Sequence, residues 1–165
     1  MTLYKQVYTS PLGKLSLVAS DTALRGIWFE DQKYFERGLE KRPLLETHPI
    51  LEETKRLLDR YFQGEAIVYT DLPLSPLGTP FQQKVWSVLL MIPFGEVITY
   101  GDLAKELDCA SAQAVGNAVG KNPISLLIPC HRVLSRDGKL IGYAGGLDRK
   151  SWLLNHEAQI KEKSC

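Results

Sequence analysis

The 165-residue sequence predicts an α/β protein of the α+β type, with strands in its first third and helices after them. Apolar and polar residues alternate in short runs near the N-terminus, and turn residues separate these runs. Further along the chain, apolar residues recur at helical spacing. Residues 72–78 are rich in Pro and Gly and stand between the two patterns. We therefore expect two small domains, residues 1–78 and residues 79–165.

The first half is expected to form a three-stranded antiparallel sheet with one helix. Residues 3–8 and 14–19 are β-type runs separated by a turn, and residues 24–29 form a third run. Helical periodicity follows, and five residues mark its apolar face: Ile50, Thr54, Leu57, Leu58 and Tyr61. Gly64 stands where a helix C-terminus is expected, and residues 66–70 are expected to be extended.

The second half is expected to be helical. The Thr-Pro pair at residues 79–80 predicts the start of a first helix. Thr99 and Ser111 are expected to cap two shorter helices, residues 100–107 and 112–119, and this outline is typical of a helix-turn-helix. The second short helix has small side chains and no acidic residue, so it could approach a DNA backbone closely. Close packing against a neighbouring helix explains the same composition equally well.

The overall composition is that of an ordinary globular protein. It is 44% hydrophobic and 24% charged, with a formal net charge of +1. The longest stretch without a charge, residues 85–95, is about half of the roughly 20 apolar residues that a membrane-spanning helix needs. The N-terminus lacks the apolar core of a signal peptide. Three cysteines without a CxxC pair indicate neither a disulfide framework nor a zinc site, so we expect a cytoplasmic protein.

Charge is distributed unevenly along this nearly neutral chain. Residues 1–78 carry 10 basic and 11 acidic side chains, whereas residues 79–165 carry 10 and 8. The basic side chains of the segment 121–150 are Lys121, Arg132, Arg136, Lys139, Arg149 and Lys150. Against them this segment has only Asp137 and Asp148. An anionic partner is expected to meet the chain here; the alternative is a solvated loop face.

Residues 129–132, Pro-Cys-His-Arg, hold the groups best suited to covalent chemistry. They follow an apolar run that is expected to be a buried strand. A thiol is nucleophilic as the thiolate, and a neighbouring imidazole can take its proton. Adjacent residues of a strand point to opposite faces, so a turn or a bridging water must bring Cys130 and His131 together. The alternative is a buried cysteine that acts as a small apolar residue, which is what we expect of Cys109 and Cys165.

Glu157 follows the apolar positions of a last expected helix and could orient His131 as the third member of a Cys–His–acid relay. Taken alone, an exposed charge at a helix end is the simpler interpretation of Glu157.

Several motifs together resemble the O(6)-methylguanine-DNA alkyltransferases, the methylated-DNA–protein-cysteine methyltransferase family. They are residues 79–86 (TPFQQKVW), 92–101 (IPFGEVITYG), 122–133 (ending in PCHRV), 142–147 (GYAGGL) and 152–157 (WLLNHE). The resemblance is dense over residues 79–157 and looser over residues 1–70.

The resemblance implies an N-terminal domain similar to ribonuclease H and a C-terminal winged-helix-like domain. The second helix of its helix-turn-helix would bind the minor groove of double-stranded DNA, and the alkylated guanine would be flipped into a pocket. A methyl or other alkyl group would pass irreversibly from O(6) of guanine, and by extension from O(4) of thymine, to Cys130. Each molecule would act once, as a monomer, without a cofactor or metal.

The resemblance also implies roles for individual residues. Cys130 would accept the alkyl group, His131 would act on it through a water, and Glu157 would orient His131. Tyr100 would drive flipping and donate to the guanine ring, while Asn122 would lie in the hinge between the helix-turn-helix and the active-site strand. The residues implied to bind the guanine are Val133, Tyr143, Ala144 and Lys150. Those implied to contact DNA are Ala112, Gln113, Ala114, Gly116 and Arg132.

Three departures from the family pattern qualify these roles. Gln113 stands where members often have an arginine that fills the gap left by the flipped base; a glutamine brings no charge and stacks less well, so we expect less efficient flipping. Ser125 stands where some members have a proline on the pocket wall. No cysteine precedes Cys109, so the zinc site of some animal members cannot form.

Two other functional classes fit parts of the sequence. A DNA-binding lesion sensor that does no chemistry would lack the reactive cysteine, and Cys130 is present. A Cys–His hydrolase would need an oxyanion hole, for which the sequence shows no recognisable motif.

Overall fold

Strand pairing near the N-terminus builds the predicted sheet. The computed structural model describes residues 1–67, 72–139 and 142–163. Strands β1 (Tyr4–Ser10), β2 (Gly13–Ala19) and β3 (Leu24–Phe29) form an antiparallel sheet in the order β1-β2-β3. The three runs predicted from the sequence are thereby confirmed, the first two with shifts of one or two residues at their ends. Residues 68–70 of the segment expected to be extended lie outside the described residues.

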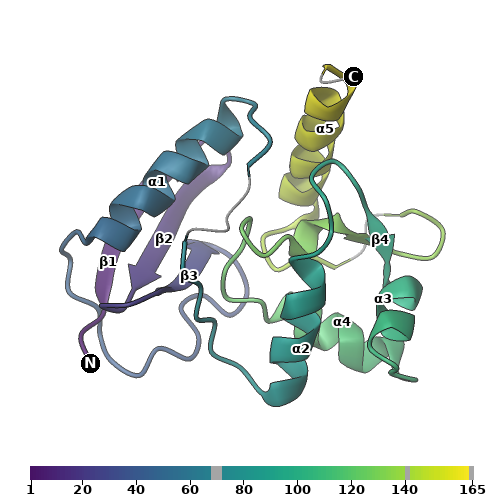
Figure 1. Ribbon diagram of the computed structural model, residues 1–165, viewed down its shortest axis with the longest axis horizontal. Helices are drawn as coiled ribbons and strands as arrows, with labels where there is room; N and C mark the ends of the chain where they lie inside the picture. Colours follow the sequence, from purple (N-terminus) through teal and green to yellow (C-terminus); the bar gives the residue numbers. More distant parts are fainter. Residues whose placement is uncertain (68–71, 140–141, 164–165) are drawn as a thin grey trace.

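Helix α1 (Pro49–Phe62) lies across β1 and β2 (Figure 1). It begins at His48, whose ring nitrogen accepts a hydrogen bond from the Ile50 N–H. Beyond its C-terminus, Gly64 has a φ of +102°, which favours glycine, as the sequence predicts. The apolar face of α1 is buried against the sheet, and Tyr61 near its end is completely buried.

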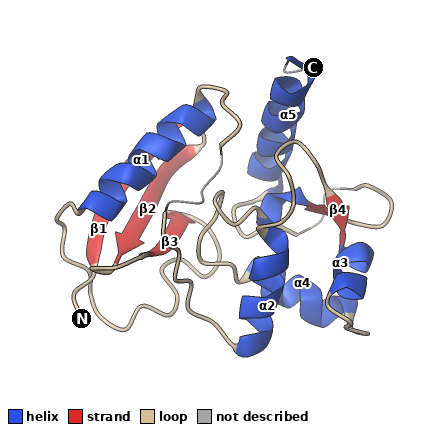
Figure 2. Cartoon of the chain, viewed as in Figure 1, coloured by secondary structure: helices blue, strands red, loops and turns tan. Residues whose placement is uncertain are grey.

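The helical half follows, as predicted (Figure 2). Its elements are α2 (Pro80–Leu89), β4 (Ile98–Thr99), α3 (Tyr100–Glu106), α4 (Ala112–Gly120), the 3-10 turn η1 (Cys130–Arg132), β5 (Val133–Leu134) and α5 (Leu147–Lys163). The predicted N-terminal caps of α2, α3 and α4 all form, at Thr79, Thr99 and Ser111.

Packing against a neighbour accounts for one face of the small-residue helix α4, and the approach of its other face to DNA stays a prediction. Val115, Ala118 and Val119 are buried, and Trp86 of α2 donates its indole N–H to the Ala118 carbonyl at 2.9 Å. On the other face, Gln113 is exposed. Helix α4 is therefore packed against a neighbour and still offers a surface of small side chains.

The strand expected before Pro129 does not form. Residues 123–129 make one isolated bridge, between Ile124 and Ile27, and otherwise follow turns. Leu126 has a φ of +73°, which breaks any extended run. The Asn122 side chain takes the place of strand partners: its amide donates to the Ile128 carbonyl at 2.8 Å, and its oxygen accepts from the Ile124 N–H. A buried segment does not have to pair as a strand where a side chain satisfies the hydrogen bonds of its backbone N–H and C=O groups.

Candidate active site

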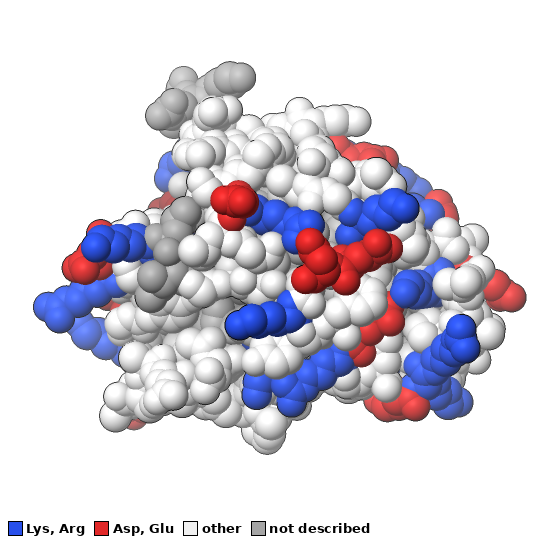
Figure 3. All heavy atoms as spheres, turned by 180° about the vertical axis from the view of Figure 1, so that it is seen from behind, with Lys and Arg blue, Asp and Glu red and all other residues white. Residues whose placement is uncertain are grey.

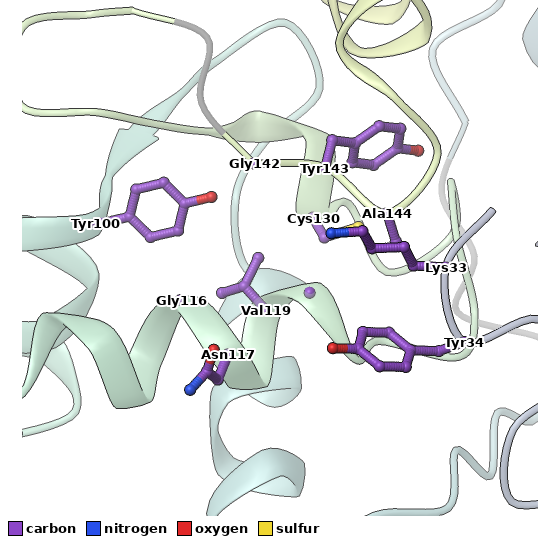
Figure 4. A pocket seen from close by; sticks show the side chains of 11 residues that line it. Lys33, Tyr34, Tyr100, Gly116, Asn117, Val119, Cys130, Gly142, Tyr143 and Ala144 are labelled. Carbon is purple, nitrogen blue, oxygen red and sulfur yellow. The ribbon is translucent and has the colours of Figure 1, made fainter.

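The thiol of Cys130 lies at the start of η1, at the edge of a cavity of about 230 Å³. Cys130 itself is 5% exposed, so a reactant must enter the cavity to reach it. Figure 4 shows Tyr100 on one side of Cys130 and Tyr34 on the other, with α4 beneath. The remaining lining residues are Lys33, Gly116, Asn117, Val119, Gly120, Gly142, Tyr143 and Ala144.

The structure brings together His131 and Glu157, two of the three members of the relay suggested by the sequence. The His131 Nε2 atom lies 2.6 Å from Glu157 Oε2, and both side chains are buried. A carboxylate only accepts, so His131 carries its proton on Nε2 and leaves Nδ1 with a free lone pair. Within the described part of the chain, no group lies within hydrogen-bond distance of the buried Nδ1 atom. The imidazole is thus held with an unused basic nitrogen.

Glu157 is not an exposed charge at a helix end: it is 1% exposed and accepts several hydrogen bonds. Besides His131, Arg132 Nε donates to Oε1 at 2.7 Å, and the Tyr61 hydroxyl donates to Oε2 at 2.5 Å. Burial alone would raise the pKa of Glu157, but the hydrogen bonds from His131 and Arg132 and the positive charge of Arg132 outweigh it and hold that pKa well below its usual range. Glu157 is therefore a permanent anion beneath the imidazole.

The prediction that Arg132 contacts DNA is corrected by its surroundings. Its side chain is buried, its guanidinium bonds Glu157 and the Ile92 carbonyl at 2.8 Å, and it lies over the Phe94 ring. A guanidinium held on three sides inside the protein cannot reach a phosphate. Arg132 instead compensates the charge of Glu157.

Burial dominates the acid–base behaviour of Cys130 and His131. It raises the pKa of the Cys130 thiol, although the Asn122 hydrogen bond and the charge of Lys150 oppose it. It lowers the pKa of His131 despite the attraction of Glu157. Both shifts favour the neutral forms, a thiol at Cys130 and an uncharged imidazole at His131.

Lys150 is completely buried and interacts with two residues that line the cavity. Its ammonium donates to the Gly142 carbonyl at 3.1 Å and lies 5.8 Å from the Tyr100 ring centroid. Burial lowers the pKa of Lys150 to about 8, and burial raises the pKa of Tyr100 to about 12. The Tyr100 hydroxyl therefore keeps its proton and remains a hydrogen-bond donor.

Some of the other residues expected to bind guanine line the Cys130 cavity and some do not. Tyr143 and Ala144 line the cavity, whereas Val133 does not: its side chain is buried and its N–H donates to the Cys130 carbonyl. Ser125, on a buried turn, donates its N–H to the Ile27 carbonyl. A proline at this position would lose that bond.

Six cavity residues were not predicted as site residues: Lys33, Tyr34, Asn117, Val119, Gly120 and Gly142. Tyr61, which donates to Glu157, was not predicted either. Three of these seven belong to the N-terminal half. Lys33 and Tyr34 come from the loop after β3, and Tyr61 comes from α1. The helical spacing of Tyr61 indicated only an apolar position. Nothing local in the sequence pairs these three residues with Cys130, because the contacts span the two halves of the chain.

Family models match both halves. One, described as the 6-O-methylguanine DNA methyltransferase DNA binding domain, matches residues 80–159, and the corresponding ribonuclease-like domain matches residues 3–76. The chain belongs to the 6-O-methylguanine DNA methyltransferase family.

Named relatives in this family cover nearly the whole chain. A methylated-DNA–protein-cysteine methyltransferase of Haemophilus influenzae is 40% identical over 94% of this chain and 86% of its own length. The Mycobacterium tuberculosis O6-methylguanine methyltransferase is 36% identical, with a TM-score of 0.83 over 96% of this chain and 94% of that chain. A structure of M. tuberculosis OGT in complex with DNA has a TM-score of 0.82 at 36% identity, over 95% of this chain and 94% of that chain.

A second hollow, of about 590 Å³, adjoins the Cys130 cavity and shares Tyr100, Gly116 and Gly142 with it. Ala112 and Gln113 also line this hollow, together with Arg136. Of the residues expected to contact DNA, Ala114 does not line it, and its N–H donates a hydrogen bond to the Ser111 hydroxyl. The surface of α4 that could receive DNA is therefore continuous with the mouth of the Cys130 cavity.

The basic segment 121–150 contributes less surface charge than its composition suggests. Arg132 and Lys150 are buried, and Arg149 pairs with Asp31 at 2.6 Å. Figure 3 shows one face of the molecule, on which basic and acidic side chains are interspersed. Among the residues placed by the structure, no group of three or more His, Cys, Asp or Glu could hold a metal ion.

Proposed function

We propose that this protein repairs DNA by transferring an alkyl group from O(6) of guanine to Cys130, as a methylated-DNA–protein-cysteine methyltransferase. The observation that carries this proposal is a buried thiol at the edge of a cavity, followed in the sequence by His131, whose imidazole a buried carboxylate fixes in one tautomer. The DNA-binding domain of the family supplies the helix beside that cavity.

The relay activates the nucleophile at the moment of reaction. The thiol proton passes, through a water, to His131 Nδ1, and the resulting imidazolium is stabilised by Glu157. The thiolate attacks the alkyl carbon, a sulfur–carbon bond forms, and the carbon–O(6) bond breaks with its electron pair going to the guanine. The Tyr100 hydroxyl, with its raised pKa, is a donor for the guanine ring as that charge develops.

The geometry requires the guanine to leave the base stack. Cys130 is 5% exposed, and a base inside a duplex cannot reach it. We infer that α4 enters the minor groove, with Ala112, Gln113 and Gly116 against the DNA, and that Tyr100 at the mouth of the cavity promotes flipping. Asn122 anchors the turn that carries Cys130 directly behind α4.

The reaction ends with Cys130 as a thioether. A thioether is a poor leaving group, and no described residue offers a means of removing the alkyl group, so each molecule acts once. We propose that the protein acts as a monomer in the cytoplasm and also accepts O(4)-alkylthymine. No described helix is long and apolar enough to span a membrane.

Mass spectrometry tests the proposal against its alternatives. Incubation with duplex DNA containing O(6)-methylguanine is expected to add one methyl group to the intact protein, located on Cys130 by peptide mapping. An unchanged mass with retained DNA binding would indicate a lesion sensor. A Cys130→Ser protein that still removed methyl groups from the DNA would contradict the mechanism. An acyl adduct on Cys130 from ester substrates would favour a hydrolase.

A further inference from the structure

Two unpaired cations gather on one aromatic ring beside the active-site cavity. The Arg37 guanidinium lies 5.2 Å from the centre of the Tyr34 ring, and the Lys121 ammonium lies 5.9 Å from it. Arg37 belongs to the loop after β3, and Lys121 is the C-terminal cap of α4. The ring thus joins a cation from each half of the chain.

Carboxylates in the same loop do not neutralise this cluster. Asp31 pairs with Arg149, Glu36 with Lys5, and Glu40 with Arg25 at 3.0 Å. In the part of the chain that the structure describes, no carboxylate lies within ion-pair distance of Arg37 or Lys121. Two cations on the same ring without a counter-ion favour the binding of an anion.

The space around the cluster is suited to such an anion. Arg37, Tyr34 and Lys121 line a hollow of about 400 Å³, and no acidic side chain is among its lining residues. Gly38 and Gly78 leave parts of its wall without side chains. The hollow is open to groups larger than water.

Tyr34 also places the hollow relative to the chemistry. The same side chain lines the Cys130 cavity, where Figure 4 shows its hydroxyl pointing inward opposite Tyr100. Tyr34 is 45% exposed, and its backbone has a φ of +61°, a value that residues other than glycine seldom adopt. One strained, exposed aromatic residue therefore separates the reactive cavity from a cationic hollow, an arrangement that is typical of functional sites.

The two hollows flank the cavity at opposite ends of α4. Gln113 and Arg136 mark the hollow near its N-terminus, and Lys121 marks the cationic hollow at its C-terminus. Nine helical residues span about 13 Å. A duplex lying across α4 would present phosphates beyond both ends of the helix.

We propose that Arg37 and Lys121 bind a backbone phosphate next to the flipped nucleotide, so that the N-terminal half of the chain takes part in DNA binding. This inference rests on the proposed function. The guanidinium and ammonium that lie over the Tyr34 ring supply the charge-assisted hydrogen bonds that a phosphate accepts.

The salt dependence of DNA binding tests this assignment. The affinity for a short unmodified duplex is measured by fluorescence anisotropy over a series of salt concentrations, for wild type and for the double variant R37Q/K121Q. Loss of one phosphate contact is expected to reduce the slope of log Kd against log salt concentration by about 1. At low salt the affinity is expected to fall roughly three- to tenfold.

The double variant R56Q/R60Q is the matched control, because it also removes two positive charges, from the exposed surface of α1, far from α4 (Figure 1). Its slope is expected to equal that of wild type. Equal slopes for R37Q/K121Q and wild type, or an equal reduction in R56Q/R60Q, would overturn the assignment.

A second measurement keeps this test separate from the proposed function. Neither Arg37 nor Lys121 lines the Cys130 cavity, so alkylation of Cys130 by a free O(6)-alkylguanine base is expected to proceed at the wild-type rate in R37Q/K121Q. Failure of the proposed function would instead appear as wild-type protein that gains no methyl group from methylated DNA.

Discussion

The Tyr61 hydroxyl donates a 2.5 Å hydrogen bond to Glu157 Oε2, the same oxygen that accepts from His131. Tyr61 belongs to α1 and Glu157 to α5, and both are buried. The N-terminal half is thus joined to the proposed catalytic relay by a charge-assisted hydrogen bond.

Tyr61→Phe is expected to weaken both stability and reactivity. The substitution keeps the ring, but the buried carboxylate loses one donor, which costs about 1–3 kcal/mol of unfolding free energy. The pKa of Glu157 is expected to rise, and His131 is then held less firmly, so alkyl transfer slows. Urea denaturation and the rate of Cys130 methylation measure the two effects.

Tyr8→Phe is the matched control for this variant. The Tyr8 hydroxyl also donates to a carboxylate, that of Asp59 at 2.6 Å, but this bond is exposed and distant from the relay. We expect it to change unfolding by less than about 1 kcal/mol and to leave the rate unchanged. Equal rates for Tyr61→Phe and Tyr8→Phe would show that the Tyr61 bond has no catalytic consequence.

Local signals in the sequence predicted most of the secondary structure. The caps at Thr79, Thr99 and Ser111, and the left-handed residue Gly64, depend on neighbouring residues only, and all of them form. Such features can be predicted because their physical cause lies within one turn of chain.

The candidate site could be predicted only in part, because its remaining contacts are non-local. The motifs around Cys130 and Glu157 indicated a relay, whereas the burial of Arg132 and the contribution of Tyr61 depend on how α1 and α5 pack. The predicted strand before Pro129 failed for a related reason. The apolar residues of this segment are buried, as those of a strand would be. The segment nevertheless forms a turn, because the Asn122 side chain makes hydrogen bonds to its backbone.

Acid is expected to destabilise the protein in two stages. Burial lowers the folded-state pKa of His131 below its ordinary value of 6.5, so the unfolded chain binds a proton more readily as the pH falls through 6.5. Glu157, with its pKa below the ordinary 4.5, adds a second loss that begins near that pH. Each unit of depression corresponds to about 1.4 kcal/mol.

Urea denaturation between pH 4 and pH 8 measures this dependence, and the free energy of unfolding is expected to fall as the pH is lowered. His131→Gln should remove the part of the fall in unfolding free energy that begins near the ordinary pKa of histidine, 6.5. A wild-type stability that is constant down to the ordinary pKa of glutamate, 4.5, would contradict the burial of a neutral His131.

Gly145→Ala is expected to disturb the cavity wall. A Cβ atom at Gly145 would lie 2.7 Å from Tyr143 Cε2 and 2.9 Å from Phe29 Cδ2, and one of these rings must move. Overpacking of this kind costs about 1–3 kcal/mol, and displacement of Tyr143 slows alkylation. Gly101→Ala is the comparison, because its nearest atom would be 3.8 Å away. If the two alanine variants reacted equally fast, the position of Tyr143 would not control the rate.

Gln113→Arg is expected to speed the repair of DNA. Gln113 is exposed in the first turn of α4, in the hollow that continues into the cavity, where a longer planar cation can fill the gap left by a flipped base. An arginine near a helix N-terminus opposes the helix dipole, at a cost of about 0.3–1 kcal/mol, so stability should fall slightly. The stacking and charge gained on DNA are larger than this loss of stability, and methylation of Cys130 from duplex DNA should become roughly two- to tenfold faster.

The free base does not need to be flipped, so its reaction with Gln113→Arg is expected to be unchanged. Gln113→Ala, compared with wild type, should slow only the reaction with duplex DNA. An arginine variant no faster than wild type on duplex DNA would mean that the residue at position 113 does not limit flipping.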